Sequence, residues 1–258
     1  MAASGPKRAR EKAMPEVIFI GTSDAFGAGG RRQTAILVRS SEGSLLLDCG
    51  PTTCSGLADL GITREEVDAI AISHYHGDHF GGVPLFLLAA RYEDLRTKPL
   101  RIVGPPGIEQ RMRDLALAMS HPFDAPDWSF PILFTELEPG VETGVGPAAI
   151  RPFAVNHNPD VQPCGFSVEV DEKRIVFSGD TGWFDELPQH VAGADLFICE
   201  CTYYDRDYPY HFSYLDLHPL SERLDVKRLI LTHLGEEMTD LRGRLDIETA
   251  DDGTKIEV

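Results

Sequence analysis

Short apolar runs alternate with turns along most of the chain, and this pattern predicts a mixed α/β protein. Three runs near the N-terminus, at residues 17–21, 34–38 and 44–48, have the length and aliphatic content of strands. Longer segments follow in which apolar residues recur with helical spacing. We therefore expect helices at residues 52–60, 79–92, 106–119, 183–192 and 214–223.

A cluster of metal-ligating side chains follows one of the apolar runs. The segment Ser73-His74-Tyr75-His76-Gly77-Asp78-His79 places three histidines and an aspartate within six residues. A turn after a buried strand can direct His74 and His76 at one metal ion, while Asp78 and His79 reach a second. The alternative is a cluster of solvated histidines on the surface, but such a cluster would contribute little to the structure. Nitrogen and carboxylate ligands together suit Zn²⁺ or a similar borderline metal.

Three further candidate ligands stand where other apolar runs end. His157 follows the run at 148–155, Asp180 follows 174–179, and His233 follows 228–232. Loops at strand ends commonly carry catalytic and binding groups, so these side chains can join the cluster in the folded protein.

In chain order these residues resemble the five-motif pattern of the metallo-β-lactamase superfamily, with Asp48 as the first motif. The resemblance spans about residues 16–240, and a match of several motifs is far more specific than one histidine cluster. It implies an α/β fold, a four-layer α/β/β/α metallo-β-lactamase sandwich with the metals at one edge between two sheets. Residues 1–15 are then expected to form a basic, disordered tail and residues 16–258 a single domain.

The resemblance also implies a centre with two divalent metal ions, Zn²⁺ in the first place, with Mn²⁺ or Fe²⁺ as alternatives. It divides the ligands as follows: His74, His76 and His157 on the first ion, Asp78, His79 and His233 on the second, and Asp180 bridging the two. A hydroxide shared by both ions would be the nucleophile. Asp78 could also accept a proton from the attacking water. Asp48 is expected to orient a ligand or a loop from outside the coordination sphere.

Two further segments are similar to motifs of the ribonuclease Z-like branch of this superfamily. They are Glu200-Cys201-Thr202 and Tyr210-His211-Phe212-Ser213, which match its acidic and His-x-Ser/Thr motifs. The resemblance implies that His211 donates a proton to the departing oxygen and that Glu200 orients His211. The alternative is that His211 satisfies a buried hydrogen bond in a loop rich in tyrosine.

The chain departs from this branch at two points. Only 22 residues separate His157 from Asp180, which leaves no room for the long arm with which tRNA-processing members grip tRNA. The small cyclic phosphodiesterases of the branch also lack the arm, but they carry a cysteine-rich zinc site near the N-terminus. This chain has no cysteine before Cys49, so that site is not expected here.

The charge and composition of the chain limit the substrates and partners that we expect it to bind. The formal net charge is −17, and residues 1–13 contain four Lys or Arg and one Glu, so the rest of the chain carries −20. An acidic body repels long polyanions, although two metal ions can still capture one phosphate. We expect a small phosphodiester substrate rather than long nucleic acid, and a homodimer is compatible with the sequence.

Neither a membrane-spanning run nor a signal peptide is evident, so a cytoplasmic protein is expected.

Other features leave alternatives open. The five cysteines are scattered and odd in number, and Cys199 and Cys201 fit small buried strand residues better than half of a zinc site. The glycine-rich segment 27–30 fits a strand connection near the mouth of the site better than a phosphate cradle. The tyrosines between residues 203 and 214 can either form a wall for a planar group or order the loop by packing.

These observations predict a metal-dependent hydrolase that acts on a small, cyclic or short phosphodiester. One alternative is a ribonuclease Z-like endonuclease that processes RNA 3′ ends. Another is a hydrolase of thioesters, lactones or lactams, which the same hydroxide could attack. His211 separates the last alternative from the first two, since a thiolate leaving group scarcely needs a proton donor.

Overall fold

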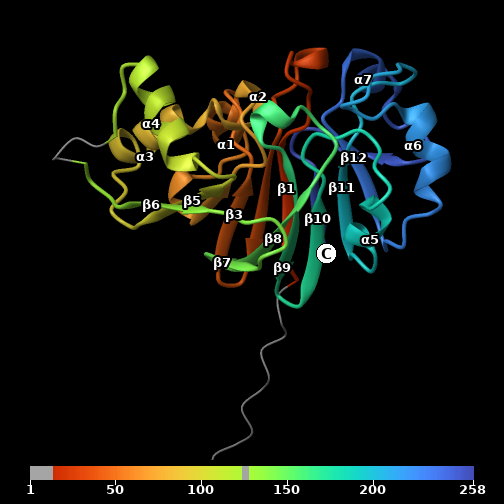
Figure 1. The fold of residues 1–258 in the computed structure, drawn as a ribbon. Coiled ribbons are helices and arrows are strands. Elements are labelled where there is room, and N and C mark those ends of the chain that lie inside the picture. The colour runs from red at the N-terminus through yellow and green to blue at the C-terminus, as the bar shows by residue number, and fades with distance from the viewer. Residues whose placement is uncertain (1–13, 124–127) are drawn as a thin grey trace, which may run out of the picture.

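The computed structural model describes residues 14–123 and 128–258, which form two seven-stranded β-sheets flanked by helices (Figure 1). Most of the basic tail expected at residues 1–15 lies outside the described residues. The first sheet has the order β14-β1-β2-β3-β4-β5-β6. Its strands are β1 (Glu16–Gly21), β2 (Ala35–Ser40), β3 (Gly43–Leu47), β4 (Ala69–Ala71), β5 (Leu100–Gly104), β6 (Ile132–Glu136) and β14 (Lys255–Glu257).

The second sheet repeats the plan of the first, with the order β13-β12-β11-β10-β9-β8-β7. In both sheets, one half is antiparallel and the other half parallel. Its strands are β7 (Thr143–Val145), β8 (Ala148–Ala154), β9 (Cys164–Val170), β10 (Lys173–Phe177), β11 (Leu196–Glu200), β12 (Leu229–Thr232) and β13 (Glu248–Thr249).

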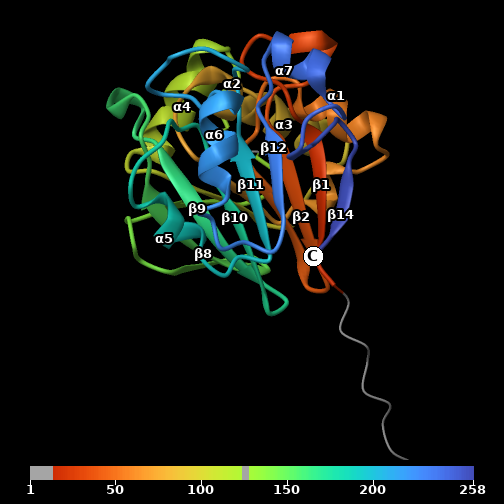
Figure 2. The same ribbon diagram turned by 90° about the vertical axis from the view of Figure 1, so that its right-hand side faces the viewer.

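Helices cover the outer face of each sheet (Figures 1 and 2). The first sheet is covered by α1 (Thr53–Asp59), α2 (Gly77–Phe80), α3 (Val83–Tyr92) and α4 (Ile108–Ala118). The second is covered by α5 (Leu187–Val191), α6 (Tyr214–Ser221) and α7 (Glu236–Leu241). Short 3-10 turns occur at Ala28–Gly30, Arg64–Glu66 and Pro159–Val161.

Three apolar cores hold these layers together, and the alternation of side chains along the strands explains them. On β1, Val17 and Phe19 face the core between the sheets, while Ile18 and Ile20 face the helices. On β10, Val176 packs in the third core, under α5–α7. Strands buried on both faces read as continuous apolar runs. The four-layer α/β/β/α sandwich implied by the family resemblance is therefore confirmed.

The helices differ from expectation where proline and glycine intervene. The single helix expected at 79–92 is two helices, α2 and α3, separated by Gly81 and Gly82. Pro84 lies in the first turn of α3, where its missing N–H costs no hydrogen bond. The helix expected at 183–192 is shortened to α5 for the same reason, because Pro188 stands in its first turn.

The described residues include no helix that is long and apolar enough to cross a membrane.

The buried interface between the sheets predicts a large stability loss when it is hollowed. Phe166 on β9 is fully buried in this core. Phe166→Ala should lower the free energy of unfolding by about 3–5 kcal/mol, the usual cost of removing a buried aromatic ring. Leu117→Ala on α4 is the control, since Leu117 is 67% exposed and should change stability by less than about 0.5 kcal/mol. Urea denaturation measures both, and equal losses would contradict this packing.

Candidate metal centre

The candidate ligands lie just beyond the carboxyl ends of strands, at the edge of the sheets near which α2 and α7 lie in both views (Figures 1 and 2). The histidine cluster follows β4, and His157 follows β8. Asp180 follows β10, and His233 follows β12. Because these strands end at a common edge, residues far apart in the sequence meet there.

Partners outside the site fix the ring orientation of two histidines in the cluster after β4. Asp48 accepts hydrogen bonds from the backbone N–H and the hydroxyl of Ser73, at 2.7 and 2.8 Å. The Ser73 hydroxyl in turn lies 3.0 Å from His74 Nδ1, and Asp48 Oδ2 lies 2.7 Å from His79 Nδ1. Both Nδ1 atoms must therefore donate, which leaves Nε2 of each ring with a free lone pair.

The other two buried histidines are oriented in the same manner. His157 Nδ1 donates to the carbonyl of Tyr210 at 3.0 Å. His233 Nδ1 lies 2.9 Å from the hydroxyl of Thr202, which donates to a Glu200 oxygen 3.2 Å away. All four rings thus direct Nε2 inward, and in a neutral ring this atom carries the free lone pair. Sequence reasoning missed Ser73 and the Tyr210 carbonyl, because hydroxyl and backbone partners carry no recognisable motif.

The inward atoms form two clusters that share Asp180. One contains His74, His76, His157 and Asp180, and the other contains Asp78, His79, Asp180 and His233; the ligand atoms of each lie within 4.8 Å of one another. Asp180 lies 3.7 Å from His74 Nε2, 3.3 Å from His79 Nε2 and 3.5 Å from His233 Nε2. The structure brings all seven predicted ligands together, with Asp180 between the two groups.

The donor atoms fit metal ions better than they fit one another. His76 Nδ1 lies 3.1 Å from the Nε2 atoms of both His74 and His157, yet it can donate at most one proton. His79 Nε2 and Asp180 Oδ1 are buried and lack a hydrogen-bond partner, although they face each other. Converging lone pairs on buried nitrogen and carboxylate oxygen are the donor set of a borderline divalent cation.

The pKa shifts of the buried histidines and of Asp180 also indicate that the two clusters require positive charge. Burial opposes charge on His79, but the carboxylates of Asp180 and Asp78 outweigh it and raise the His79 pKa well above its usual range. Burial likewise opposes charge on His233, and Asp180 and Asp78 raise its pKa to about 9. The pKa of Asp180 is held well below its usual range by His233 and His79, against the effect of burial. Protons on these histidines take the place that cations would fill.

His211 pairs with Glu200 beside the second cluster. His211 Nδ1 donates to Glu200 Oε1 at 2.8 Å, and Glu200 also accepts from the backbone N–H groups of Thr181 and Thr202 at 3.0 and 3.1 Å. Burial lowers the pKa of His211, but Glu200 outweighs burial and raises it. The His211 ring stacks on His233 with 5.5 Å between centroids. The expected pair is thus formed, and Nε2 of His211 is left for a ligand.

A cavity of about 300 Å³ opens onto these groups. It is lined by four of the candidate ligands, by His211 and by residues of two loops: Asp24, Ala25, Phe26, His76, Gly77, Asp78, Asp180, Thr202, Tyr203, Tyr208, His211 and His233. Asp24, Ala25 and Phe26 of this lining directly precede the glycine-rich segment 27–30, which itself does not line the cavity. Sequence reasoning did not single out Phe26, whose role depends on where the loop folds.

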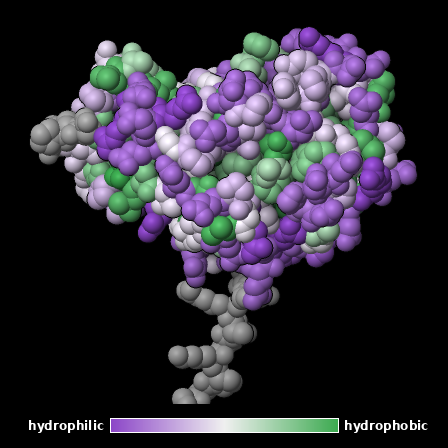
Figure 3. Space-filling view, in the orientation of Figure 1, coloured by the Kyte–Doolittle hydropathy of each residue, from purple (hydrophilic) through white to green (hydrophobic). Residues whose placement is uncertain are grey.

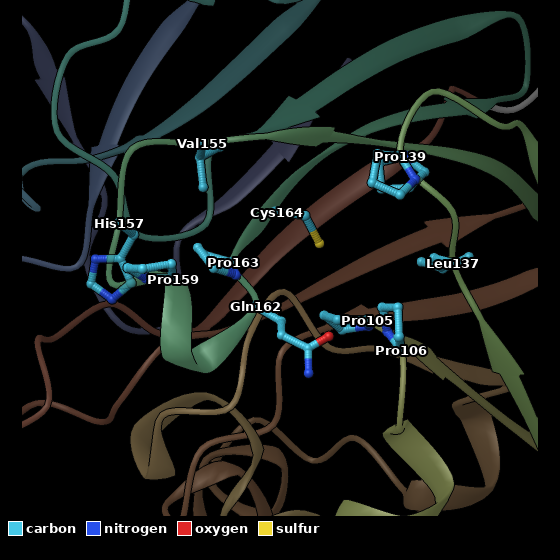
Figure 4. A pocket seen from close by; sticks show the side chains of 11 residues that line it. Pro105, Pro106, Leu137, Pro139, Val155, His157, Pro159, Gln162, Pro163 and Cys164 are labelled. Carbon is cyan, nitrogen blue, oxygen red and sulfur yellow. The ribbon is translucent and has the colours of Figure 1, made fainter.

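A second pocket of about 340 Å³ is lined in part by His157, one of the candidate ligands (Figure 4). Its wall is mostly proline, and none of its lining residues also lines the cavity over the metal ligands. The pocket is lined by Pro105, Pro106, Leu137, Pro139, Pro152, Val155, His157, Pro159, Gln162, Pro163 and Cys164. Apolar residues gather in a hollow near the middle of the face seen in Figure 3.

The tyrosines and cysteines divide between the site and the core. Tyr203 and Tyr208 line the cavity, whereas Tyr204 and Tyr214 stack on each other with 6.0 Å between centroids in the third core. The packing function is thus seen for Tyr204 and Tyr214, whereas binding of a planar group by Tyr203 and Tyr208 stays a prediction. Cys199 and Cys201 are buried in the third core, in line with the structural interpretation.

Comparisons with known proteins identify the family and the fold of this chain. A sequence profile of the family described as "Anti-Pycsar protein Apyc1" matches residues 15–249. A ribonuclease Z of Lachnoclostridium phytofermentans is 28% identical, over 88% of this chain and 89% of that protein. The metallo-β-lactamase-fold protein YhfI of Bacillus subtilis superposes with a TM-score of 0.75 at 24% identity, covering 94% of this chain and 99% of that one. The short form of human tRNase Z superposes with a TM-score of 0.76 at 23% identity, covering 93% and 98%.

The shared position of Asp180 predicts coupled loss of metal. Elemental analysis should find close to two metal ions per chain in the native protein, and Asp180→Ala should lower the content of both sites because one carboxylate serves both. Asp246→Ala is the matched control, since the Asp246 side chain is 89% exposed and lies outside the site. A single ion in the native protein, or unchanged content in the Asp180 variant, would contradict a shared ligand.

Proposed function

The chain belongs to the Anti-Pycsar protein Apyc1 family, in the ribonuclease Z-like branch of the metallo-β-lactamase superfamily, and we propose that it is a two-metal phosphodiesterase acting on a small phosphodiester. The family and the His/Asp clusters support the general conclusion that the protein is a metal-dependent hydrolase. The proposal goes further in naming two ions and a cyclic or short phosphodiester substrate.

One observation carries the proposal: His211, which is paired with Glu200, lines a single cavity together with members of both ligand clusters. His74, His76 and His157 would hold one ion, Asp78, His79 and His233 the other, and Asp180 both. When bound, the ions act as Lewis acids on a phosphoryl oxygen and lower the pKa of water, which supplies a nucleophile at neutral pH. Zn²⁺ suits the donor set, and Mn²⁺ or Fe²⁺ are the alternatives.

The His211–Glu200 pair can protonate the leaving group, which is the contribution that cleavage of a phosphodiester requires from the protein itself. An alkoxide is a poor leaving group, so a proton must reach its oxygen as the bond to phosphorus breaks. His211 carries that proton on Nε2, because Nδ1 is already committed to Glu200. Glu200 is fully buried, and its negative charge stabilises the protonated ring. The stacked faces of Tyr208 and His233 hold the ring in place.

Asp78 is the second candidate for proton transfer. Its carboxylate lies 3.1 Å from His79 Nε2 and 3.4 Å from His233 Nε2. Although burial favours the neutral acid, His79 and His233 outweigh it and keep the pKa of Asp78 below its usual range. Asp78 therefore stays ionised at neutral pH and can accept a proton from water in the cavity.

RNA 3′ processing is the second candidate function, favoured by the names of relatives such as the ribonuclease Z of Lachnoclostridium phytofermentans. Two features weigh against it. The segment between His157 and Asp180 is used up by the turn at Pro159–Val161 and the hairpin of β9 and β10, so it contributes no projecting arm. The strongly acidic chain also offers little of the Lys and Arg that bind a phosphate backbone.

Hydrolysis of a thioester, lactone or lactam is a third candidate that uses the same ions. A thioester makes less use of the His211–Glu200 pair, because a thiolate leaves without protonation, whereas the oxygen of a lactone or the nitrogen of a lactam needs a proton as a phosphodiester does. With a thioester as substrate, the buried Glu200, which accepts four hydrogen bonds including one from His211, would serve no catalytic purpose. The pair therefore favours an oxygen leaving group.

Removing the proton donor should separate catalysis from metal binding. His211→Ala should keep both metal ions, yet lose roughly 10²–10⁴-fold in turnover of esters with alkoxide leaving groups, the range for a positioned general acid. The loss should shrink for p-nitrophenyl esters, whose leaving group needs no proton. His218→Ala is the control, because His218 is a half-exposed histidine on α6 outside the cavity lining. Loss of metal from the His211 variant would instead make His211 a ligand.

A direct competition should separate the first two candidate functions. At matched metal and pH, a cyclic nucleotide or a short phosphodiester should be cleaved with a higher kcat/KM than a 3′-extended tRNA precursor. RNA binding should be weak near physiological salt, because few phosphates can be neutralised. Efficient trimming of the precursor at one site, with negligible cleavage of the small esters, would identify a processing nuclease instead.

A further inference from the structure

Phe26 is exposed to an extent that packing does not explain. Its side chain is 91% exposed, more than any other large apolar side chain among the described residues. None of the ring contacts found in residues 14–123 and 128–258 involves it. An aromatic ring in water forgoes the free energy of burial that usually keeps phenylalanine inside.

The loop that carries Phe26 is nevertheless tightly built. Asp24 is nearly buried, and its Oδ1 accepts hydrogen bonds from the backbone N–H groups of Phe26 and Ala28 at 3.0 and 3.3 Å. Gly27 follows with φ of 73°, a conformation that favours glycine. Gly29 donates to Glu236 on α7 at 3.1 Å. These contacts hold the backbone of Phe26 in one place, so its exposure is a feature of the fold.

That place is the wall of the catalytic cavity. Phe26 lines it together with the candidate ligands His76 and Asp78 and with Tyr203 and Tyr208 of the loop before α6. The two tyrosines already have partners on their rings. The Arg206 guanidinium lies 4.7 Å from the centroid of Tyr203, and Tyr208 stacks on His211 at 5.7 Å. Phe26 is thus the aromatic ring of the lining that has no ring or cation partner among the described residues.

We propose that Phe26 forms a stacking subsite for the planar base of a nucleotide whose phosphodiester is cleaved at the metal centre. The inference rests on the proposed function and adds a specificity-determining residue to it. A base offers a flat π-face at its far end from the phosphate, and stacking on an aromatic ring needs no hydrogen-bond partner. The rigid loop presents that ring without further ordering, which lowers the entropic cost of binding.

The experiment compares two substrates that differ only in the base. One is adenosine 3′,5′-cyclic phosphate, and the other is the same cyclic ribose phosphate with a methoxy group in place of adenine. Phe26→Ala should lower kcat/KM for the nucleotide by roughly 5- to 100-fold, the effect expected from losing one base–aromatic stack, chiefly through KM. It should lower kcat/KM for the base-free ester by less than about two-fold. Because the ring is exposed, the variant should fold and keep its metal ions.

Two further variants make the test specific. Phe26→Trp should retain or improve the preference for the nucleotide, whereas Phe26→Leu should lose most of it while remaining apolar. Tyr92→Ala is the matched control, because Tyr92 is another exposed aromatic residue, 62% exposed, outside the cavity lining. Equal losses on both substrates, or none on either, would overturn the subsite while leaving the phosphodiesterase intact. If the unaltered protein cleaved neither ester, the proposed function itself would be wrong, and the subsite with it.

Discussion

A buried carboxylate, Asp180, imposes the constraint on which the rest of the site depends. Its side chain is 3% exposed, and three histidine Nε2 atoms lie within 3.7 Å of it. An isolated buried charge is very costly unless it is paired or bound to metal. When the rings are neutral, the fold directs lone pairs, rather than N–H groups, at this carboxylate. The arrangement is stable only with positive charge between the groups, which two cations would provide and which protonated histidines replace when cations are absent.

The protein supports this costly arrangement from outside the ligand set. Asp48 and His233 both have positive φ, 58° and 55°, a conformation that non-glycine residues adopt at a cost. Asp48 is held there by its bonds to Ser73 and His79, and His233 by Thr202. The strained backbone lies at strand ends, next to the rigid sheets that can tolerate it. Asp48 and His233, which orient or belong to the ligand set, are therefore also residues with a strained backbone, as is common at functional sites.

The sequence predicted which polar side chains converge better than it predicted the scaffold. His157, Asp180 and His233 each follow an apolar run, and those runs became β8, β10 and β12. Strands such as β5, β9 and β14 were not identified, because their pairing partners, rather than local propensity, determine them. β14 lies at the C-terminus yet pairs with β1. The backbone partners of Glu200 and the position of Phe26 were likewise beyond prediction, since both depend on loops that meet only in the folded chain.

The site also separates chemistry from recognition. The ligands and the His211–Glu200 pair come from strand ends and the loop before α6, whereas Phe26 comes from the loop after β1. Relatives with the same ligands can therefore act on different substrates by changing loops alone.

Anomalous X-ray diffraction at the zinc absorption edge, on crystals grown with Zn²⁺, tests the central claim most directly. The account predicts two peaks of comparable height, one among His74, His76 and His157 and the other among Asp78, His79 and His233, with Asp180 touching both. A single peak, or a peak held by Glu200 and His211, would contradict the shared-carboxylate centre and the role assigned to His211.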